Sequence, residues 1–217
     1  MKKNIRYLYR VLIYVLGLFF MAMGVAFSVN SKLGVSPVNS LPYVISLISG
    51  MELGTCVTAV FSVYILAQIL LKRKDFKWIN LTQLVFSAMF GYFVDYAKWI
   101  AGSFVLPGYI GQLATLGISM VFVAVGLSLY LGVKLVNMPM EGMTIAISQH
   151  FPDIPFHRMK ISVDCSTVAL GIALSFLFLG SLQGIGEGTV ICALLIGKML
   201  PITQKPILPV VERICFG

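Results

Sequence analysis

The chain has 217 residues, of which 59% are hydrophobic and only 11% are charged, whereas about a quarter of the residues in an ordinary soluble protein are charged. This is the composition of an integral membrane protein, and it excludes a water-soluble globular domain. The net charge of +8 does not indicate a nucleic-acid-binding protein, because the basic residues gather in the segments between the apolar stretches.

The order of apolar stretches predicts an all-α membrane protein with six transmembrane helices. Each stretch has close to the ~20 residues that a helix needs to cross the hydrocarbon core. The first follows basic residues, as a signal peptide does, but its apolar run is longer than a signal core and five more stretches follow, so we expect it to be retained. The predicted spans are 8–29, 54–71, 81–100, 111–132, 160–180 and 187–204.

Two shorter apolar segments, 37–50 and 139–151, each begin at a proline. With ~13 residues they are too short to cross the bilayer, and they suit re-entrant or broken helices. Pro37 and Pro139 would each begin a short helix whose free N–H groups face an anion or a polar solute. A plain proline kink in a longer helix is the alternative.

Residues 24–48 recur, without a gap, as residues 126–150. The matched residues are Gly24, Lys32, Leu33, Pro37, Ile45 and Ser46 in the first copy and Gly126, Lys134, Leu135, Pro139, Ile147 and Ser148 in the second. The glycine, lysine and proline matches carry most weight, because these residues are scarce or structurally awkward inside lipid. Interrupted hydrophobic segments at matching places in two halves indicate the binding site of a transporter.

The repeat predicts a single integral membrane domain over 1–217, with repeat one at about 8–104 and repeat two at about 111–205. Because each repeat has an odd number of spans, the second would enter the membrane from the opposite face, giving two inverted three-helix repeats. The pairs Ser87–Gly91 and Ala193–Gly197 occupy matched positions, and small residues at this spacing let helices approach closely.

The distribution of basic residues predicts that both termini are cytoplasmic. All the lysines and arginines except Lys32 and Lys98 fall on one side of the predicted spans. Cytoplasmic loops carry an excess of these residues. The segment at 37–50 would then be reached from outside the cell.

Short glycine-based motifs give the chain a resemblance to a known family. They are LGVSP at 33–37, Gly50, Gly54-Thr55, the spacing from Gly91 to Asp95, and GIGEGT at 184–189. Together they resemble the YczE/YyaS/YitT-like family of bacterial integral membrane proteins. The resemblance implies a multi-pass protein of the bacterial cell (inner) membrane and brings no substrate.

The chain departs from this family directly after the first short segment begins. Family members commonly carry an aromatic residue and an acid at the positions of Val38 and Asn39. Glu141 occupies the equivalent position in the second half, two residues after Pro139. Its carboxylate would complement the positive helix end, with Lys134 as its partner, or take a coupling proton or a cation.

Two further acids belong to the predicted site. Asp164 has Lys160 four residues before it, a spacing that allows an ion pair, although ionisable residues inside a span are also candidates for function. Glu187 lies at the glycine-rich entrance of the last span, as a solvated residue or a gate. The predicted substrate-binding residues are Ser36, Pro37, Asn39, Pro139, Glu141, Asp164, Glu187 and Thr189.

The sequence contains no nucleophile elbow, P-loop, zinc motif or dinucleotide fingerprint, so we expect neither an enzyme nor a cofactor or metal site. The predicted partners are the lipid bilayer and a small-molecule or ion substrate, with no nucleic acid, and a homodimer is left open. The sequence therefore favours a small secondary transporter. A non-transporting membrane accessory or scaffold protein and an uncoupled channel are the alternatives, since fold alone does not decide function.

Overall fold

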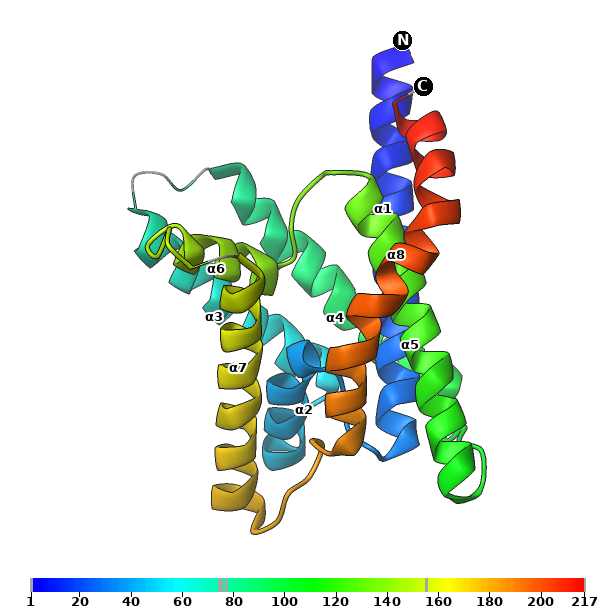
Figure 1. Cartoon of the computed structure of the whole chain (residues 1–217), viewed down its shortest axis with the longest axis vertical. Coiled ribbons are helices and arrows are strands. Elements are labelled where there is room, and N and C mark those ends of the chain that lie inside the picture. The colour runs from blue at the N-terminus through cyan, green and yellow to red at the C-terminus, as the bar shows by residue number, and fades with distance from the viewer. Residues whose placement is uncertain (1, 74–75, 77, 155, 217) are drawn as a thin grey trace. The chain divides into compact units, whose positions relative to one another are not determined.

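The computed structural model describes residues 2–73, 76, 78–154 and 156–216, and every regular element among them is helical (Figure 1). The helices are α1 (Lys2–Ser31), α2 (Pro37–Ser49), α3 (Leu53–Lys72), the short 3₁₀ helix η2 (Trp78–Leu81), α4 (Thr82–Ala101), α5 (Gly108–Gly132), α6 (Pro139–Ser148), α7 (Phe156–Leu179) and α8 (Glu187–Cys215).

Five of these helices are long and apolar enough to cross a membrane, namely α1, α3, α5, α7 and α8. The prediction of a multi-pass, all-α membrane protein is therefore confirmed. The predicted span at 81–100 is a helix, α4, but it is not among the five. Gln83, Asp95 and Lys98 lower its apolar character.

The last helix is longer than predicted. The sequence placed its end at 204, but α8 continues to Cys215 in spite of Pro201, Pro206 and Pro209. Each proline removes one backbone donor and crowds the preceding turn, which bends a helix without necessarily ending it. The ribbon of α8 bends accordingly along its course (Figure 1).

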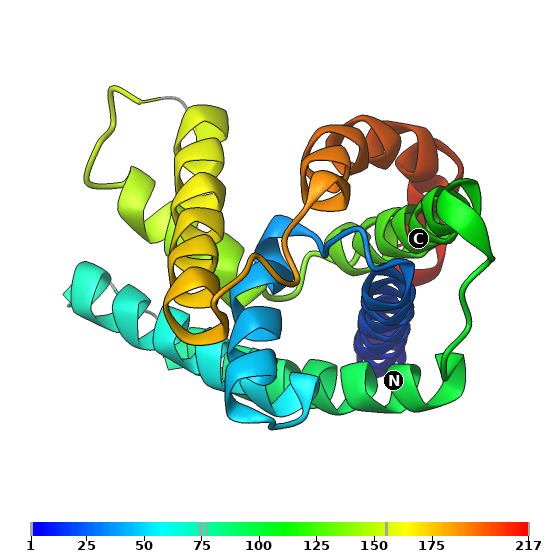
Figure 2. The same ribbon diagram turned by 90° about the horizontal axis from the view of Figure 1, so that it is seen from below.

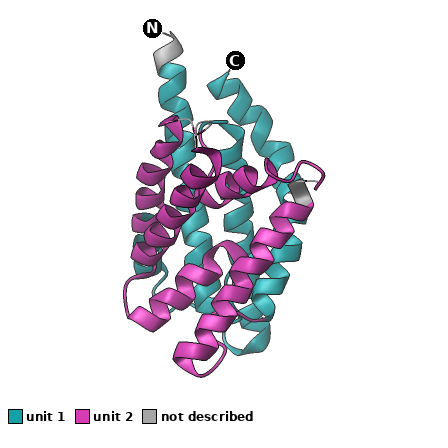
Figure 3. Ribbon diagram, turned by 90° about the vertical axis from the view of Figure 1, so that its left-hand side faces the viewer, with its two compact units in different colours: residues 1–36, 93–135, 187–217 teal, residues 37–92, 136–186 magenta. Residues whose placement is uncertain are grey.

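The helices form two compact units that alternate along the chain (Figure 3). Unit 1 contains α1, α5, α8 and the second part of α4, within residues 1–36, 93–135 and 187–217. Unit 2 contains α2, α3, α6, α7 and the first part of α4, within residues 37–92 and 136–186. Each unit therefore draws helices from both predicted repeats.

In unit 1, α1 and α5 pack closely through small residues. A Cβ atom on Gly17 would lie 2.9 Å from the Gly126 carbonyl oxygen, and the Ser119 hydroxyl donates a hydrogen bond to the Gly24 carbonyl at 2.7 Å. Gly17 is thus next to Gly126, whereas Gly24, which comes later in α1, is next to Ser119, which comes earlier in α5. The two helices therefore run antiparallel.

In unit 2, α2 packs against α7 and α3 packs against α6 (Figures 1 and 2). The predicted close approach at Ser87–Gly91 is confirmed: a Cβ on Gly91 would collide with the Gly54 carbonyl and the Thr58 hydroxyl of α3. The matching pair in unit 1, Ala193–Gly197, behaves differently. Both residues are exposed, and a Cβ on Gly197 would have no neighbour within 4 Å among the described residues.

Lys32 and Lys134 share a rare backbone conformation. Their φ angles are +60° and +51°, in the left-handed region that lysine seldom adopts. Each N–H donates to the carbonyl three residues earlier, on Val29 and Leu131, at 3.2 Å in both cases. The two turns that lead to the short helices α2 and α6 thus have the same local structure.

Candidate functional site

The structure divides the predicted site residues between the two units. Five of them belong to unit 2, where the short helices α2 and α6 both pack against α7; they are Pro37, Asn39, Pro139, Glu141 and Asp164. Ser36, Glu187 and Thr189 belong to unit 1. Unit 2 by itself therefore contains most of the candidate site.

Glu141 lies in the first turn of α6, a helix of 10 residues that is too short to span a bilayer. Its Oε2 atom is buried and has no hydrogen-bond partner among the described residues. Burial raises the pKa of the Glu141 carboxyl above its ordinary value of 4.5, because desolvation penalises the charged form. Its own backbone N–H and Lys160 oppose that rise, and Asp164 adds to it.

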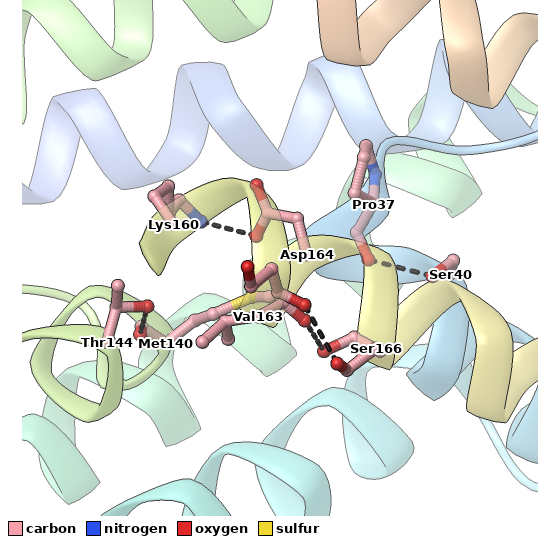
Figure 4. Close-up of polar contacts among 10 residues, drawn as sticks. Pro37, Ser40, Met140, Thr144, Lys160, Val163, Asp164 and Ser166 are labelled. Carbon is pink, nitrogen blue, oxygen red and sulfur yellow. Dashed lines mark hydrogen bonds and ion pairs between the residues drawn. The ribbon is translucent and has the colours of Figure 1, made fainter. Parts of the chain in front are cut away.

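Lys160 and Asp164 form the predicted ion pair on α7, with Nζ 2.6 Å from Oδ1 (Figure 4). The two side chains are only 25% and 26% exposed, so the pair is largely withdrawn from solvent. Because α6 packs against α7 and the charges of both residues act on Glu141, we group the two carboxylates and the ammonium group as the Glu141 cluster.

Lys134, the partner predicted for Glu141, is engaged elsewhere. Its Nζ lies 3.9 Å from Oε1 of Glu212 in unit 1, and both side chains are exposed. The prediction was wrong because sequence proximity favoured Lys134, whereas α6 packs against α7 and so brings Glu141 to the lysine of that helix. Lys160 is the cation that acts on Glu141.

A buried amide pair adjoins the start of α6. The Gln68 amide nitrogen donates to Oε1 of Gln83 and to the Pro139 carbonyl, both at 3.0 Å, while the Gln83 amide donates back to Gln68 at 3.4 Å. Gln68 is fully buried and also touches Gly142. These contacts join α3, α4 and the helix that carries Glu141.

Tyr64 and Thr167 complete the polar lining near the charges. Tyr64 on α3 is 7% exposed and Thr167 on α7 is 6% exposed. The Tyr64 hydroxyl is buried and has no hydrogen-bond partner among the described residues, and it lies near Thr167 and Asp164. Sequence reasoning missed these two residues and the glutamines, although polar side chains inside apolar helices were the signal that could have found them.

The two proline-led helices, α2 and α6, have α7 as a common neighbour. Figure 4 shows Pro37 and Ser40 of α2 together with Met140 and Thr144 of α6 beside the segment of α7 that carries Asp164. The Ser40 hydroxyl donates to the Pro37 carbonyl at 2.7 Å, and Asn39 is 6% exposed. Both proline-led helices therefore pack against α7.

The three predicted residues of unit 1 have other surroundings. Glu187 is exposed at the start of α8, beside Tyr109, while Thr189 is 3% exposed. Between them the N–H of Gly188 donates to the Leu33 carbonyl at 2.8 Å, tying α8 to the segment that ends at half-buried Ser36. No group of three or more metal-ligating side chains occurs in the part of the chain that the structure describes.

Comparisons with known proteins give relatives without an assigned activity. A family described as "Family of unknown function (DUF6198)" matches residues 8–205. The "Uncharacterized protein YyaS" of Bacillus subtilis (strain 168) is 26% identical over 202 residues, which is 92% of each chain. No solved structure matches the chain.

Proposed function

The chain belongs to the DUF6198 family, as its resemblance to YyaS-like proteins predicted, and from its own structure we propose that it is a small secondary transporter. Its solute would be small and polar or ionic. The Glu141 cluster, charged and largely buried inside unit 2, is the observation that carries this proposal. Such ionisable groups within a membrane protein mark solute and ion pathways.

The energetics of the cluster favour a functional role over a structural one. A buried ion pair adds little net stability compared with apolar side chains of similar volume, and an unpaired buried carboxylate destabilises the fold. Glu141 is half-buried, and its Oε2 is a buried carboxylate oxygen without a hydrogen-bond partner among the described residues. A protein that served only as a scaffold would gain stability by losing it.

We further propose that the two halves form inverted repeats with six spans, α4 being the sixth. The matching turns at Lys32 and Lys134, each followed by a proline-led helix, support the repeat. Re-entrant positions for α2 and α6 follow from their lengths of 13 and 10 residues.

The α1–α5 contact supports the inversion. Gly24 is the repeat mate of Gly126, and extending the same register towards the N-terminus pairs Gly17 with Ser119. If each residue is replaced by its repeat mate, the contact between Gly17 and Gly126 becomes the contact between Ser119 and Gly24. That second contact is also present. A two-fold axis relates contacts in this way. Since the helices are antiparallel, that axis is perpendicular to them and would lie in the membrane plane.

Unit 2 supports the same relation at the level of whole helices. The repeat pairs α2 with α6 and α3 with α7. Exchanging them converts the α2–α7 packing into α6–α3 packing, and α2–α3 packing into α6–α7 packing, and all four contacts are present. Inverted repeats of this kind allow a site to open alternately to either side of a membrane.

A ligand screen followed by a transport assay tests the function. We expect a small polar or ionic solute to raise the melting temperature of the purified protein, because a ligand stabilises the state it binds. In vesicles of phosphatidylethanolamine and phosphatidylglycerol, the same solute should accumulate above its external concentration when a proton or sodium gradient is imposed.

Glu141→Gln should abolish most of this accumulation while the protein still folds and inserts. Equilibration without accumulation under every imposed gradient would support an uncoupled channel instead. If no solute that binds crosses the vesicle membrane, the protein is an accessory or scaffold.

A further inference from the structure

The Glu141 cluster has an unbalanced charge. Glu141 and Asp164 carry two carboxylates, and Lys160 supplies one ammonium group, so the fully ionised cluster has an excess of one negative charge. The groups that face it from the other elements do not restore the balance. α3 contributes Tyr64 and Gln68, which are both uncharged at neutral pH.

The excess charge falls on Glu141. Asp164 already forms an ion pair, with its Oδ1 atom 2.6 Å from Nζ of Lys160. In contrast, Oε2 of Glu141 is buried and has no hydrogen-bond partner among the described residues. A buried carboxylate oxygen without a hydrogen-bond partner is costly unless a positive charge binds it. The cluster is therefore electrically neutral only when it binds one more cation.

We infer that the Glu141 carboxylate takes up a single positive charge, a proton or an alkali metal ion, and that this is the ion coupled to transport. The inference rests on the proposed function and names its coupling chemistry. When a proton binds, it adds to Oε2 and nothing leaves the site; an alkali ion competes for the same oxygen. Either ion brings the cluster to neutrality.

The stability of the purified full-length chain in detergent reports this binding. Since the folded-state pKa of Glu141 is raised, the stabilising effect of its proton is full below about pH 4.5 and is lost as the pH rises through the folded value. The melting temperature in choline chloride should therefore fall with rising pH. If an alkali ion binds, lithium, sodium or potassium chloride at equal ionic strength should restore it at high pH only; if only a proton binds, the profile should be the same in every salt.

Four variants change the charge of the cluster in a defined way. Glu141→Gln and Asp164→Asn each remove the excess negative charge, so the dependence of the melting temperature on pH and on the alkali ion should be lost. Lys160→Met raises the excess to two charges and should move the midpoint up by about one pH unit or more. The double variant Glu141→Gln/Lys160→Met returns the excess to one charge, now on Asp164, and the response should reappear.

Glu52→Gln is the matched control, because Glu52 is an exposed glutamate in unit 2 and its variant should keep the wild-type profile. A wild-type melting temperature that does not change with pH would overturn the inference. It would also be overturned if the pH dependence survives Glu141→Gln or does not return in the double variant. If Lys160→Met does not fold, the isosteric variants Glu141→Gln and Asp164→Asn still decide. If the proton or alkali ion binds but no solute is transported, only the proposed function is overturned. If a solute is transported without ion binding at Glu141, only this inference is overturned.

Discussion

Gln68 is a fully buried amide whose hydrogen bonds hold the start of α6. Gln68→Met keeps most of the side-chain volume but leaves the Pro139 carbonyl and the Gln83 amide without this partner. An unsatisfied buried polar group costs about 1–3 kcal/mol, so we expect a clearly lower melting temperature in detergent.

Gln149→Met provides the comparison, since Gln149 is an exposed glutamine at the other end of α6. Its melting temperature should stay close to that of the wild type. Equal melting temperatures for the two variants would show that the amide pair does not hold α6 in place.

Individual residues were predictable where the evidence was local. The pair formed by Lys160 and Asp164 follows from their spacing on one helix, and the structure confirms it. The surroundings of Glu141 were not predictable, because they depend on which helix α6 packs against. Apolar periodicity does not specify that choice when nearly every helix is apolar on all sides.

At the scale of the helices, two glycines of α5 differ in how closely another helix approaches them. A Cβ on Gly126 would lie 2.6 Å from the Gly17 carbonyl oxygen, whereas a Cβ on Gly117 would have no neighbour within 4 Å in the part of the chain that the structure describes. Gly126→Ala should therefore destabilise the protein by about 1–3 kcal/mol through overpacking. Gly117→Ala should be neutral or stabilising by up to about 1 kcal/mol, because alanine favours the helix.

Thermal denaturation of both variants in detergent checks this expectation. A stable Gly126→Ala protein would mean that α1 and α5 can separate at this point without loss. The helices themselves were well predicted: among the described residues, six long helices and two short proline-led ones occur in the expected order. The predicted span 187–204 is shorter than α8, which continues to Cys215 because prolines can be accommodated by a bend.

For the whole molecule, the proposed topology makes opposite predictions for the two ends of α3. Met51, exposed just before α3, should lie outside the cell, and Arg73, just after it, should lie inside. In a background without native cysteines, Met51→Cys should react with a membrane-impermeant maleimide in intact cells. Arg73→Cys should react only after permeabilisation, and the reverse pattern would invert the topology.

At this scale the sequence predicted the membrane class and the family, both of which are confirmed. It did not predict the division into two units, because a linear reading groups neighbours along the chain. The helices instead group by equivalent position: α1 with α5, and α2 and α3 with α6 and α7.

This interleaving has a consequence for biogenesis. When a ribosome has made the first half of the chain, neither unit has its full set of helices: α1 awaits α5 and α8, while α2 and α3 await α7 and α6. Until the second half arrives, the α1–α5, α2–α7 and α3–α6 packing cannot form, although α2 and α3 can already pack against each other. Gln68 on α3 can already pair with Gln83 on α4, but the Pro139 carbonyl to which its amide also donates arrives only with the second half, so the units are assembled after that half is made.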